Sequence, residues 1–527
     1  MRKSSTTKIQ SIGIMLVLTI LIAIPFSCKK MDKFNNIDEK ALPYGAYVPA
    51  ALLQTMEENI IKLNEPWTYQ LQQNLNADCF SQQMATNNFF GSNQNNTTYS
   101  FRPGWNNEIP RIFQSGVMDS WLNIKAATKD KDKDPDLYSI SLILKVLAAS
   151  RVTDVFGPIP YTKYGQGTNV GFDSQQALYN EFFTELKYAI ETLTSIETST
   201  PNQDAKWTSS DKSNLGGDYK NWVKLANTLR LRLAMRISKA DPGKAKDEAQ
   251  GAANNSFGFL ETIPFSILGS PNPVWVMSGS YDDMRFGAVM ESLLKGYGDP
   301  RLTLYALPAT DPDPNIFGKI IGIRQGILLT DKTTYQGYSR LNLQTSTPVK
   351  LMSQAESFFL RAEGALNSWN MNGSAKDLYE KGIAASFSEN GLDASDVTKY
   401  FADITNNKAS AYVDPKNPAN DVPLGTSYLS TSPKIWSTDA TQNLEQIITQ
   451  KYIAVFPEGM EAWTEFRRTG FPKLWPLIVN YSTVIPKNEF VKRLSYTDLY
   501  IKSSQYSSAV ALLGGPDNEN TKLWWNK

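Results

Sequence analysis

Residues 352–388 read MSQAESFFLRAEGALNSWNMNGSAKDLYEKGIAASFS. The first half has apolar residues at intervals of three and four, at Ala355, Phe359, Ala362 and Leu366. After an Asn372-Gly373 break, the second half repeats this helical spacing at Ala375, Leu378, Tyr379, Gly382 and Ile383. Small residues at the contact, with large residues between them, are typical of helix hairpins of the tetratricopeptide type. The stretch therefore predicts a helix hairpin.

The same helical spacing recurs on the N-terminal side of the hairpin. Apolar positions at intervals of three and four run through 137–147, 178–193 and 222–237. Each such helix needs neighbours to cover its apolar face, so several of them imply a helical bundle or stack. The chain lacks the clean repeat of about 34 residues that a tetratricopeptide array has. We predict a mainly α-helical fold with tetratricopeptide-like hairpins.

Long irregular stretches separate the predicted helices. These stretches are rich in Gly, Pro, Asn, Ser and Thr, and they cover 87–110, 200–218, 262–282, 303–348 and 404–440. Irregular chain on this scale usually serves recognition. Few strands are expected, all of them short, and we place them at 319–323 and 326–329. We therefore expect the functional residues on the loops.

The N-terminus has the pattern of an export signal. Three basic residues precede an uncharged apolar run at 12–24. This run is shorter than the roughly 20 residues of a membrane span, but it suits the core of a secretory signal. Cys28 follows almost at once, which is typical of a bacterial lipoprotein whose cleavage leaves a lipidated N-terminal cysteine. The alternative is ordinary signal-peptidase cleavage with an incidental cysteine.

This interpretation divides the chain into three parts. We expect a lipoprotein signal peptide at 1–27, a lipidated N-terminus and tether at 28–50, and one α-helical ligand-binding domain at 51–527. Cleavage would leave Cys79 without a partner for an intramolecular disulfide, so the core alone must stabilise the fold. Beyond residue 28 no segment reaches the length of a membrane span, so we expect a soluble domain tethered by lipid.

The charge balance and the absence of histidine exclude several classes of function. The chain has 53 Lys and Arg against 52 Asp and Glu, and this net charge of +1 argues against nucleic-acid binding. It has no His, which removes Ser-His-Asp and Cys-His nucleophiles, His-ligated zinc and the usual general base near neutral pH. Hydrolysis by paired carboxylates and binding without catalysis both remain open.

Two acidic motifs have structural interpretations that we prefer. Glu356 and Glu363 lie two helical turns apart, about 10 Å along the axis. One helix face does not straddle a glycosidic bond, so we interpret them as acids on a helix surface. Asp311, Asp313 and Asn315 imitate the start of a calcium loop, but the required glycine and final glutamate are missing. We predict neither a catalytic residue, nor a metal site, nor a cofactor.

Aromatic and amide side chains gather on the long loops. Sugars present an apolar C–H face and a rim of hydroxyl groups, which a flat ring flanked by Asn, Asp or Arg groups can match. The alternative for any one ring is that it anchors its loop to the core. On loop position and chemistry we predict five ligand contacts: Asn88, Phe89, Trp105, Trp275 and Arg285.

A series of motifs in a fixed order resembles a known family. The motifs are Leu75-Asn76-Ala77-Asp78, Thr153-Asp154 with Gly157-Pro158-Ile159-Pro160-Tyr161, ANTLRLRLAMR at 226–236, Asp299-Pro300-Arg301-Leu302, AESFFLRAE at 355–363, Glu461-Ala462-Trp463 with Phe466-Arg467-Arg468-Thr469-Gly470, and Trp524-Trp525-Asn526. With the lipoprotein signal ending at Cys28, their order resembles the SusD/RagB family of Bacteroidota outer-membrane lipoproteins, in its nutrient-binding branch. The resemblance covers essentially the full length.

The resemblance implies both a fold and a function. The SusD-like fold is a mostly α-helical single domain with tetratricopeptide-like hairpins, and loops form its binding surface on one side. Members capture oligosaccharides, or peptides in some cases, and deliver them to a SusC-like TonB-dependent transporter without catalysis. The implied location is the cell outer membrane, lipid-anchored and facing the exterior. The implied partners are this transporter, a glycan or peptide ligand and the membrane, with no nucleic acid.

Two alternatives from other functional classes stay open. One is a surface-anchored glycan hydrolase that uses paired carboxylates. The other is a structural or adhesive surface lipoprotein that binds no small ligand. Turnover of a polysaccharide by the purified protein would favour the hydrolase, whereas co-purification with a large plugged barrel would count against the adhesive protein.

Overall fold

A computed structural model of the chain describes residues 48–128, 133–167, 169–201 and 206–527. The predicted signal peptide, Cys28 and most of the predicted tether lie outside these described residues. Within the described ranges, no helix is both long enough and apolar enough to cross a bilayer.

Helices dominate the regular structure. The α-helices are α2 (Pro49–Ile60), α3 (Pro66–Tyr69), α4 (Pro103–Asn106), α5 (Glu108–Ile112), α6 (Asp119–Ala127), α7 (Pro135–Phe156), α8 (Gln175–Ser199), α9 (Tyr219–Arg236), α10 (Pro242–Ala253), α11 (Pro273–Trp275), α12 (Ala288–Gly296), α13 (Arg301–Tyr305), α14 (Glu356–Leu366), α15 (Ala375–Glu389), α16 (Ala394–Ala402), α17 (Ala440–Ala454), α18 (Gly459–Thr469), α19 (Asp498–Ile501) and α20 (Tyr506–Leu513). Short π-helical and 3-10 segments are η2 (Gln70–Asp78), η3 (Asn96–Thr98), η4 (Phe113–Met118), η5 (Thr208–Ser210), η6 (Val276–Ser280) and η7 (Pro418–Asn420). Five of the longer helices begin at a side-chain cap, which satisfies otherwise unpaired backbone N–H groups: Ser174, Asp218, Asp241, Ser374 and Asp439.

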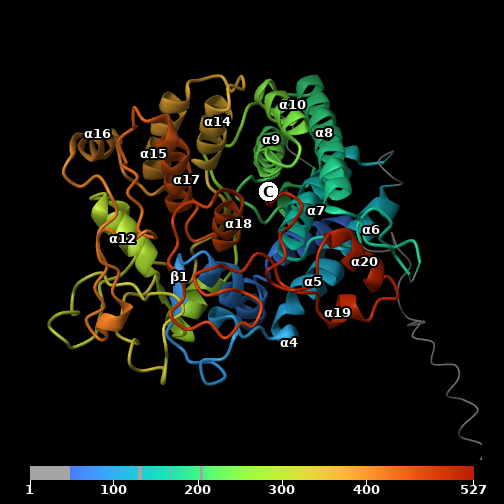
Figure 1. The fold of residues 1–527 in the computed structure, drawn as a ribbon. Coiled ribbons are helices and arrows are strands. Elements are labelled where there is room, and N and C mark those ends of the chain that lie inside the picture. The colour runs from blue at the N-terminus through green and yellow to red at the C-terminus, as the bar shows by residue number, and fades with distance from the viewer. Residues whose placement is uncertain (1–47, 129–132, 168, 202–205) are drawn as a thin grey trace, which may run out of the picture.

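The long helices pack in two connected rows. In the first row α7 contacts α8, α8 contacts α9, and α9 contacts α10. In the second row α14 contacts α15, and α17 contacts both of them. A contact between α9 and α14 joins the rows, and Figure 1 shows the two groups side by side. The helices predicted over 137–147, 178–193 and 222–237, and the hairpin in 352–388, are confirmed.

The α14–α15 hairpin packs through the small residues that predicted it. Ala355 and Ala362 are fully buried, and Gly382 of α15 faces the ring of Phe359 on α14. A Cβ atom added to Gly382 would lie 2.7 Å from Phe359 Cε1, closer than van der Waals contact allows. The close approach of the two helices therefore depends on a glycine at this position.

A buried network of charged side chains links the helices. On α9, Arg232 pairs with Glu356 at 2.6 Å, and Arg236 pairs with Asp154 and Glu461, each at 2.7 Å. These residues belong to four of the sequence motifs quoted above, so those motifs encode contacts between α7, α9, α14 and α18. Removing one member of such a pair leaves an uncompensated charge in the core, which is strongly destabilising. The helices must therefore pack so that each buried charge meets its partner.

Two small sheets tie the loops to the helices. Antiparallel β1 (Met84–Thr86) and β3 (Met284–Phe286) form one sheet, and β2 (Phe265–Ile267) and β4 (Val349–Met352) form the other. The expectation of few, short strands is confirmed, but their predicted positions at 319–323 and 326–329 are wrong.

The apolar residues of 319–329 are buried without forming a strand. Its buried residues join a small second core beneath the 309–338 loop, made of Ala85, Ala309, Ile316, Ile321, Ile323, Ile327, Leu329, Tyr335 and Tyr338. Within this loop Ile323 makes only an isolated bridge to Gly287, and Gly326 has a φ of +75° that interrupts an extended chain. The apolar character of this stretch therefore reflects burial inside a loop.

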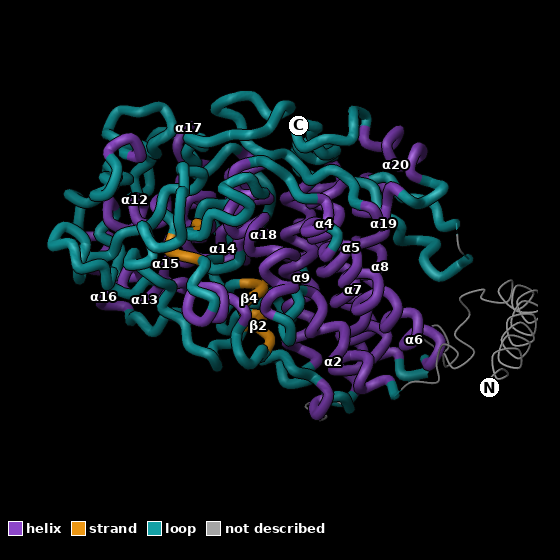
Figure 2. Tube along the Cα trace, turned by 90° about the horizontal axis from the view of Figure 1, so that it is seen from below, coloured by secondary structure: helices purple, strands orange, loops and turns teal. Residues whose placement is uncertain are grey.

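Irregular chain is concentrated on one side of the molecule. In Figure 2 the long helices α7, α8 and α9 lie toward one side, and irregular chain covers the opposite side around α12 and α15. The two-stranded sheets lie between the helices and the loops. This arrangement holds the loop residues on a rigid helical support.

Candidate functional site

The β1–β3 sheet brings two predicted contact loops together. Its register pairs Thr86 with Met284. Because the strands are antiparallel, the residues that follow β1 lie beside those that precede β3. Asn88 and Asp283 are therefore neighbours although 195 positions separate them, and Asn88 Nδ2 donates to Asp283 Oδ1 at 2.8 Å.

Asp283 is the centre of a polar group that we call the Asp283 cluster, defined as Gln70, Asn88, Asp283 and Lys332. Gln70 Nε2 donates to the second carboxylate oxygen at 3.1 Å, and Lys332 Nζ lies 2.6 Å from Oδ1. Asp283 is buried, whereas Asn88 and Lys332 are partly exposed. The cluster thus joins three separate segments of the chain at one charged group beneath the surface.

Exposed aromatic side chains lie next to each arm of this cluster. Phe89 follows Asn88, Tyr281 precedes Asp283 by two positions, and Trp67 precedes Gln70 by three. All three rings are exposed, with Trp67 retaining 49% of its accessible surface. Lys332 Nζ also donates to the backbone carbonyl of Tyr281 at 2.7 Å, which fixes that loop against the cluster. The short helix α3, which contains Trp67, packs against α11.

Trp275 on α11 borders a separate hollow beside these rings. We call it the Trp275 hollow; its volume is about 280 Å³, and it is lined by Trp275, Ser278, Gly279, Ser280, Leu307, Arg340, Leu341 and Leu343. Arg340 donates Nε and Nη2 to Asp282 Oδ1, at 3.1 and 2.7 Å. Its Nη1 has no hydrogen-bond partner among the described residues. The hollow therefore combines a half-buried indole ring with an unused N–H donor.

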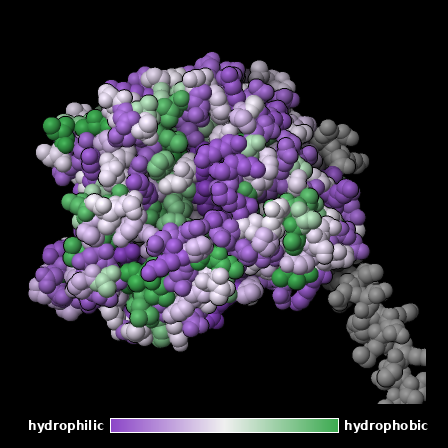
Figure 3. Space-filling view, in the orientation of Figure 1, coloured by the Kyte–Doolittle hydropathy of each residue, from purple (hydrophilic) through white to green (hydrophobic). Residues whose placement is uncertain are grey.

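The molecular surface is mixed in polarity. On the face drawn in Figure 3, apolar side chains form separate patches within a largely hydrophilic surface. An aromatic ring with polar neighbours on such a surface is the combination that a hydroxyl-rich ligand requires.

Arg285 does not belong to this surface, and its prediction as a ligand contact is corrected. The side chain is fully buried in β3, where Nη2 donates to Asp282 Oδ1 at 2.6 Å and Nη1 to its neighbour's carbonyl at 2.8 Å. Nε donates to the Gln336 carbonyl at 3.1 Å. Burial lowers the pKa of Arg285, and the Asp282 carboxylate only partly offsets this. Its role is to hold the 330s loop against β3.

Trp105 packs against two neighbouring side chains, Phe90 and Arg102. It is half-buried in α4, and its ring meets that of Phe90 edge-on at a centroid distance of 6.0 Å. The Arg102 guanidinium lies 5.3 Å from the indole centroid. These contacts fit the alternative in which the ring anchors its loop, although the indole still has an exposed part.

The acidic pair considered for hydrolysis has a structural role. Glu356 and Glu363 are both buried rather than on a helix surface, so that expectation is corrected. Glu356 receives two hydrogen bonds from Arg232 at 2.6 and 2.7 Å, and Glu363 receives two from Arg468, both at 2.6 Å. Carboxylates held by arginines inside the core are not available to a sugar. Among the described residues no group of three or more Cys, Asp or Glu side chains is arranged to hold a metal ion.

Sequence reasoning missed Trp67, Tyr281 and Arg340. Trp67 directly follows Pro66 at the start of a helix, where a large apolar residue projects before the helix has neighbours to cover it. A large apolar residue directly after a proline that starts a helix could therefore have identified Trp67. Arg340 could not have been found, because only the fold brings it against Trp275. Whether any of these residues, or Asn88, Phe89, Trp105 and Trp275, contacts a ligand stays a prediction.

Comparisons with known proteins identify relatives along almost the whole chain. A family model described as SusD-like, Susd and RagB outer membrane lipoprotein, matches residues 31–526. A comparison with curated proteins finds no match.

Several solved structures are similar to this chain. A chitin-binding SusD homologue from Flavobacterium johnsoniae is 39% identical, with a TM-score of 0.85 over 91% of this chain and 98% of that chain. A SusD homologue from Bacteroides vulgatus is 34% identical, with a TM-score of 0.83 over 91% and 97%. A SusD-like protein from Bacteroides thetaiotaomicron is 30% identical, with a TM-score of 0.82 over 91% and 99%. The family and the mainly α-helical fold predicted from the motifs are confirmed, and this chain belongs to the SusD-like family of Susd and RagB outer membrane lipoproteins.

Proposed function

We propose that the protein captures glycan chains at the cell surface through exposed rings and leaves every covalent bond of the ligand intact. The contact surface consists of Trp67, Phe89, Trp275 and Tyr281, with polar contacts from Asn88 and Arg340. Rings stack on the C–H faces of sugars, and the amide and guanidinium groups bond to hydroxyl or acetamido groups.

One observation supports this proposal above the others. Exposed rings from three segments distant in sequence lie next to residues that bind a single buried carboxylate, Asp283. An ion-paired and hydrogen-bonded support of this kind keeps the loops in position before ligand arrives, which reduces the entropy lost on binding. Arg340 is held to Asp282 in the same way.

Chains of N-acetylglucosamine are the first ligand class to test. The Flavobacterium johnsoniae relative is described as chitin-binding and shares 39% of its residues with this chain. Each stacked ring contributes about 0.5–1.5 kcal/mol, so single contacts are weak and several sugar units must bind together. Affinity should therefore rise with oligosaccharide length.

Capture at the membrane requires an anchor and a recipient. We propose that Cys28 is the lipidated N-terminus, that the protein faces the exterior, and that it delivers ligand to a SusC-like TonB-dependent transporter. The family description as an outer membrane lipoprotein supports the anchor. Mass spectrometry of the processed N-terminus, protease treatment of intact cells and co-purification from membranes test these three points separately.

The binding test compares ring deletions by isothermal titration with chitohexaose, with other glycans and a peptide mixture alongside. We expect Trp67→Ala and Trp275→Ala each to weaken binding about two- to tenfold. The matched control is Tyr188→Ala on α8, an aromatic residue on the helical side, which should bind like the wild type.

The result also separates the functional classes. Retention of a glycan without released products supports capture, whereas turnover by the purified protein would support a hydrolase. Unchanged glycan affinity in the folded Trp67→Ala, Trp275→Ala double variant would refute the proposed surface. Peptide binding in place of glycan binding would keep the capture mechanism but change the ligand class.

A further inference from the structure

A second cavity lies deeper in the molecule, where the β2–β4 sheet meets α13, α15 and the turn before α18. We call it the central recess. Its volume is about 320 Å³, close to the lower end of the roughly 300–1,000 Å³ of small-molecule sites, so it accommodates one ring and not a chain. Leu343 lines both the central recess and the Trp275 hollow, so the two cavities share a wall.

The recess opens to solvent along one edge. Pro348 is exposed there, and Asn342, Leu343 and Thr347 are half-exposed. On the interior side the Tyr305 and Phe456 rings lie 4.7 Å apart and are both buried, which gives the recess an apolar inner wall. A ligand can therefore enter from the loop side and place an apolar face against aromatic rings.

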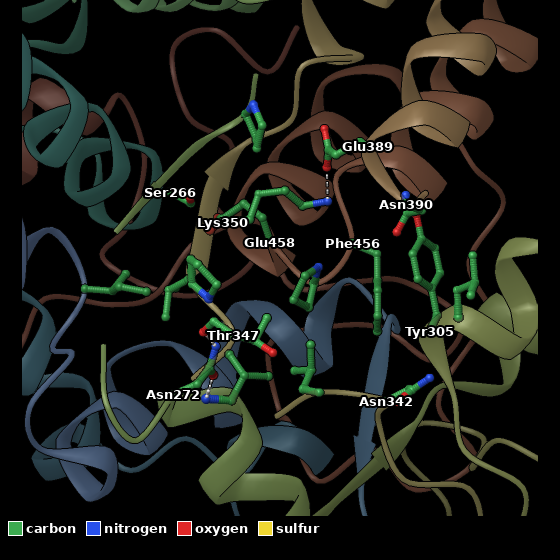
Figure 4. A pocket seen from close by; sticks show the side chains of 18 of the residues that line it. Ser266, Asn272, Tyr305, Asn342, Thr347, Lys350, Glu389, Asn390, Phe456 and Glu458 are labelled. Atoms are coloured by element: carbon green, nitrogen blue, oxygen red, sulfur yellow. Dashed lines mark hydrogen bonds and ion pairs between the residues drawn. The ribbon is translucent and has the colours of Figure 1, made fainter. Parts of the chain in front are cut away.

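The charged groups of the recess are already satisfied by one another. Lys350 Nζ lies 2.6 Å from Glu389 Oε1, an ion pair drawn in Figure 4. Glu389 Oε2 accepts from Ser353 Oγ at 2.7 Å and from the Gln354 N–H at 2.8 Å. Glu458 pairs with an arginine at 2.9 Å. A ligand therefore has no unpaired charge to neutralise, which favours a neutral molecule.

Neutral polar groups with unused bonding capacity surround the Tyr305 ring. Asn390 and Asn342 lie on either side of Tyr305 in Figure 4. Asn390 Nδ2 donates to Tyr305 Oη at 3.3 Å, and Asn342 Nδ2 donates to the Thr303 carbonyl at 3.2 Å. Within the described ranges, neither amide oxygen accepts a bond and the Tyr305 hydroxyl proton has no acceptor. The recess thus offers two acceptors and one donor around a ring.

We propose that the central recess binds one neutral sugar unit, either a free monosaccharide or the terminal unit of a longer chain. Its ring would lie against Tyr305 and Phe456, and its hydroxyl groups would bond to Asn342, Asn390 and the Tyr305 hydroxyl. The assignment rests on the aromatic inner wall of the recess, its paired charges and its unused neutral polar groups. It holds or fails independently of glycan capture at Trp67 and Trp275.

The test uses monosaccharides, which are too small to span the exposed rings. N-acetylglucosamine, glucose and galactose are titrated into the purified protein and followed by saturation-transfer NMR and calorimetry, with glucuronate as a charged probe. We expect saturable binding of at least one neutral sugar in the millimolar range and weaker binding of glucuronate. Asn342→Trp, which places a bulky ring at the mouth, should weaken that binding at least about tenfold.

Two further variants distinguish the recess from the surface. Tyr305→Phe keeps the ring but removes the hydroxyl, and we expect binding about two- to tenfold weaker. Trp275→Ala should leave monosaccharide affinity unchanged while it weakens chitohexaose binding. Thermal unfolding confirms that each variant is folded.

Three results would overturn the assignment. The first is that no monosaccharide binds to the folded wild type at millimolar concentration. The second is that binding is equal in Asn342→Trp and the wild type, and the third is that Trp275→Ala abolishes it. If the Trp variants lose chitohexaose binding but keep monosaccharide binding, both proposals are supported. If the wild type binds monosaccharides but not chitohexaose, only the proposed surface is refuted.

Discussion

Glu57 on α2 should make the protein less stable as the pH rises through the neutral range. The side chain is fully buried, its Oε2 accepts from the Lys212 N–H at 2.9 Å, and its Oε1 has no hydrogen-bond partner. Burial, with the neighbouring Asp211 carboxylate adding to the effect, raises the pKa of Glu57 from 4.5 to about 9. Glu57 therefore stays protonated at neutral pH.

The size of the effect follows from this pKa. The folded-state pKa lies above the unfolded value, so the full stability is present below pH 4.5 and is lost as the pH rises toward about 9. The loss is about 1.4 kcal/mol per pH unit within that window. At pH 7 the protonated carboxyl therefore costs about 3 kcal/mol relative to an unfolded chain in which Glu57 is ionised.

Glu57→Gln removes this dependence while keeping the shape of the side chain. The amide oxygen can still accept from Lys212, and the amide N–H can donate toward Asp211. We expect the free energy of unfolding of the variant, minus that of the wild type, to increase by about 4 kcal/mol between pH 5 and pH 8. Guanidinium denaturation followed by tryptophan fluorescence measures the difference.

The control is Glu58→Gln on the same helix, whose carboxylate pairs with Lys212 at a more exposed position. Exposed ion pairs contribute little to stability, so its pH dependence should be much smaller. A constant difference between Glu57→Gln and the wild type across pH 5–8 would refute the reasoning, because it would mean that Glu57 ionises normally inside the fold.

Three other changes test the packing and the buried charges. Gly382→Ala should lower the free energy of unfolding by about 1–3 kcal/mol, because the added Cβ would meet Phe359. Gly243→Ala in α10 is the control and should not destabilise the protein, because no atom lies within 4 Å of the added Cβ. Equal effects of the two changes in urea denaturation would contradict the close approach of α14 and α15. Arg236→Met should cost about 3–5 kcal/mol because it removes the charge paired with buried Asp154 and one of the charges paired with Glu461. A loss below about 1 kcal/mol would count against this account. Burial opposes ionisation of Glu461, but adjacent arginine and lysine charges outweigh it and lower its pKa from 4.5 to about 2. Its stabilisation is present above pH 4.5 and is lost as the pH falls toward 2, so the cost of Glu461→Gln should shrink over that range in denaturation at stepped pH.

Part of the candidate site could be anticipated from the chain alone. Asn88, Phe89 and Trp275 are predicted because they combine loop position with the right chemistry, and the fold places Asn88 in the Asp283 cluster and Trp275 at a hollow. Arg285 looked equally suitable, but Asp282 and the distant Gln336 carbonyl take up its donors inside the protein. The charge and position of a residue do not reveal whether the fold has already satisfied it.

The acidic motifs illustrate the same limit. Helical spacing placed Glu356 and Glu363 correctly on one helix, but it gave no sign that Arg232 and Arg468 approach from other helices. Their burial depends on contacts between segments more than 100 positions apart. Local periodicity reports which face of a helix is apolar, and it does not report what the polar positions will meet.

The order of helices, the hairpin at 352–388 and the export signal pattern follow from the amino-acid sequence, because each depends on residues close together along the chain. The Asp283 cluster, the buried ion-pair network, the Trp275 hollow and the central recess were decided only by the tertiary structure. Each of these joins side chains from distant segments, and the balance between burial cost and pairing energy is settled only when those segments meet.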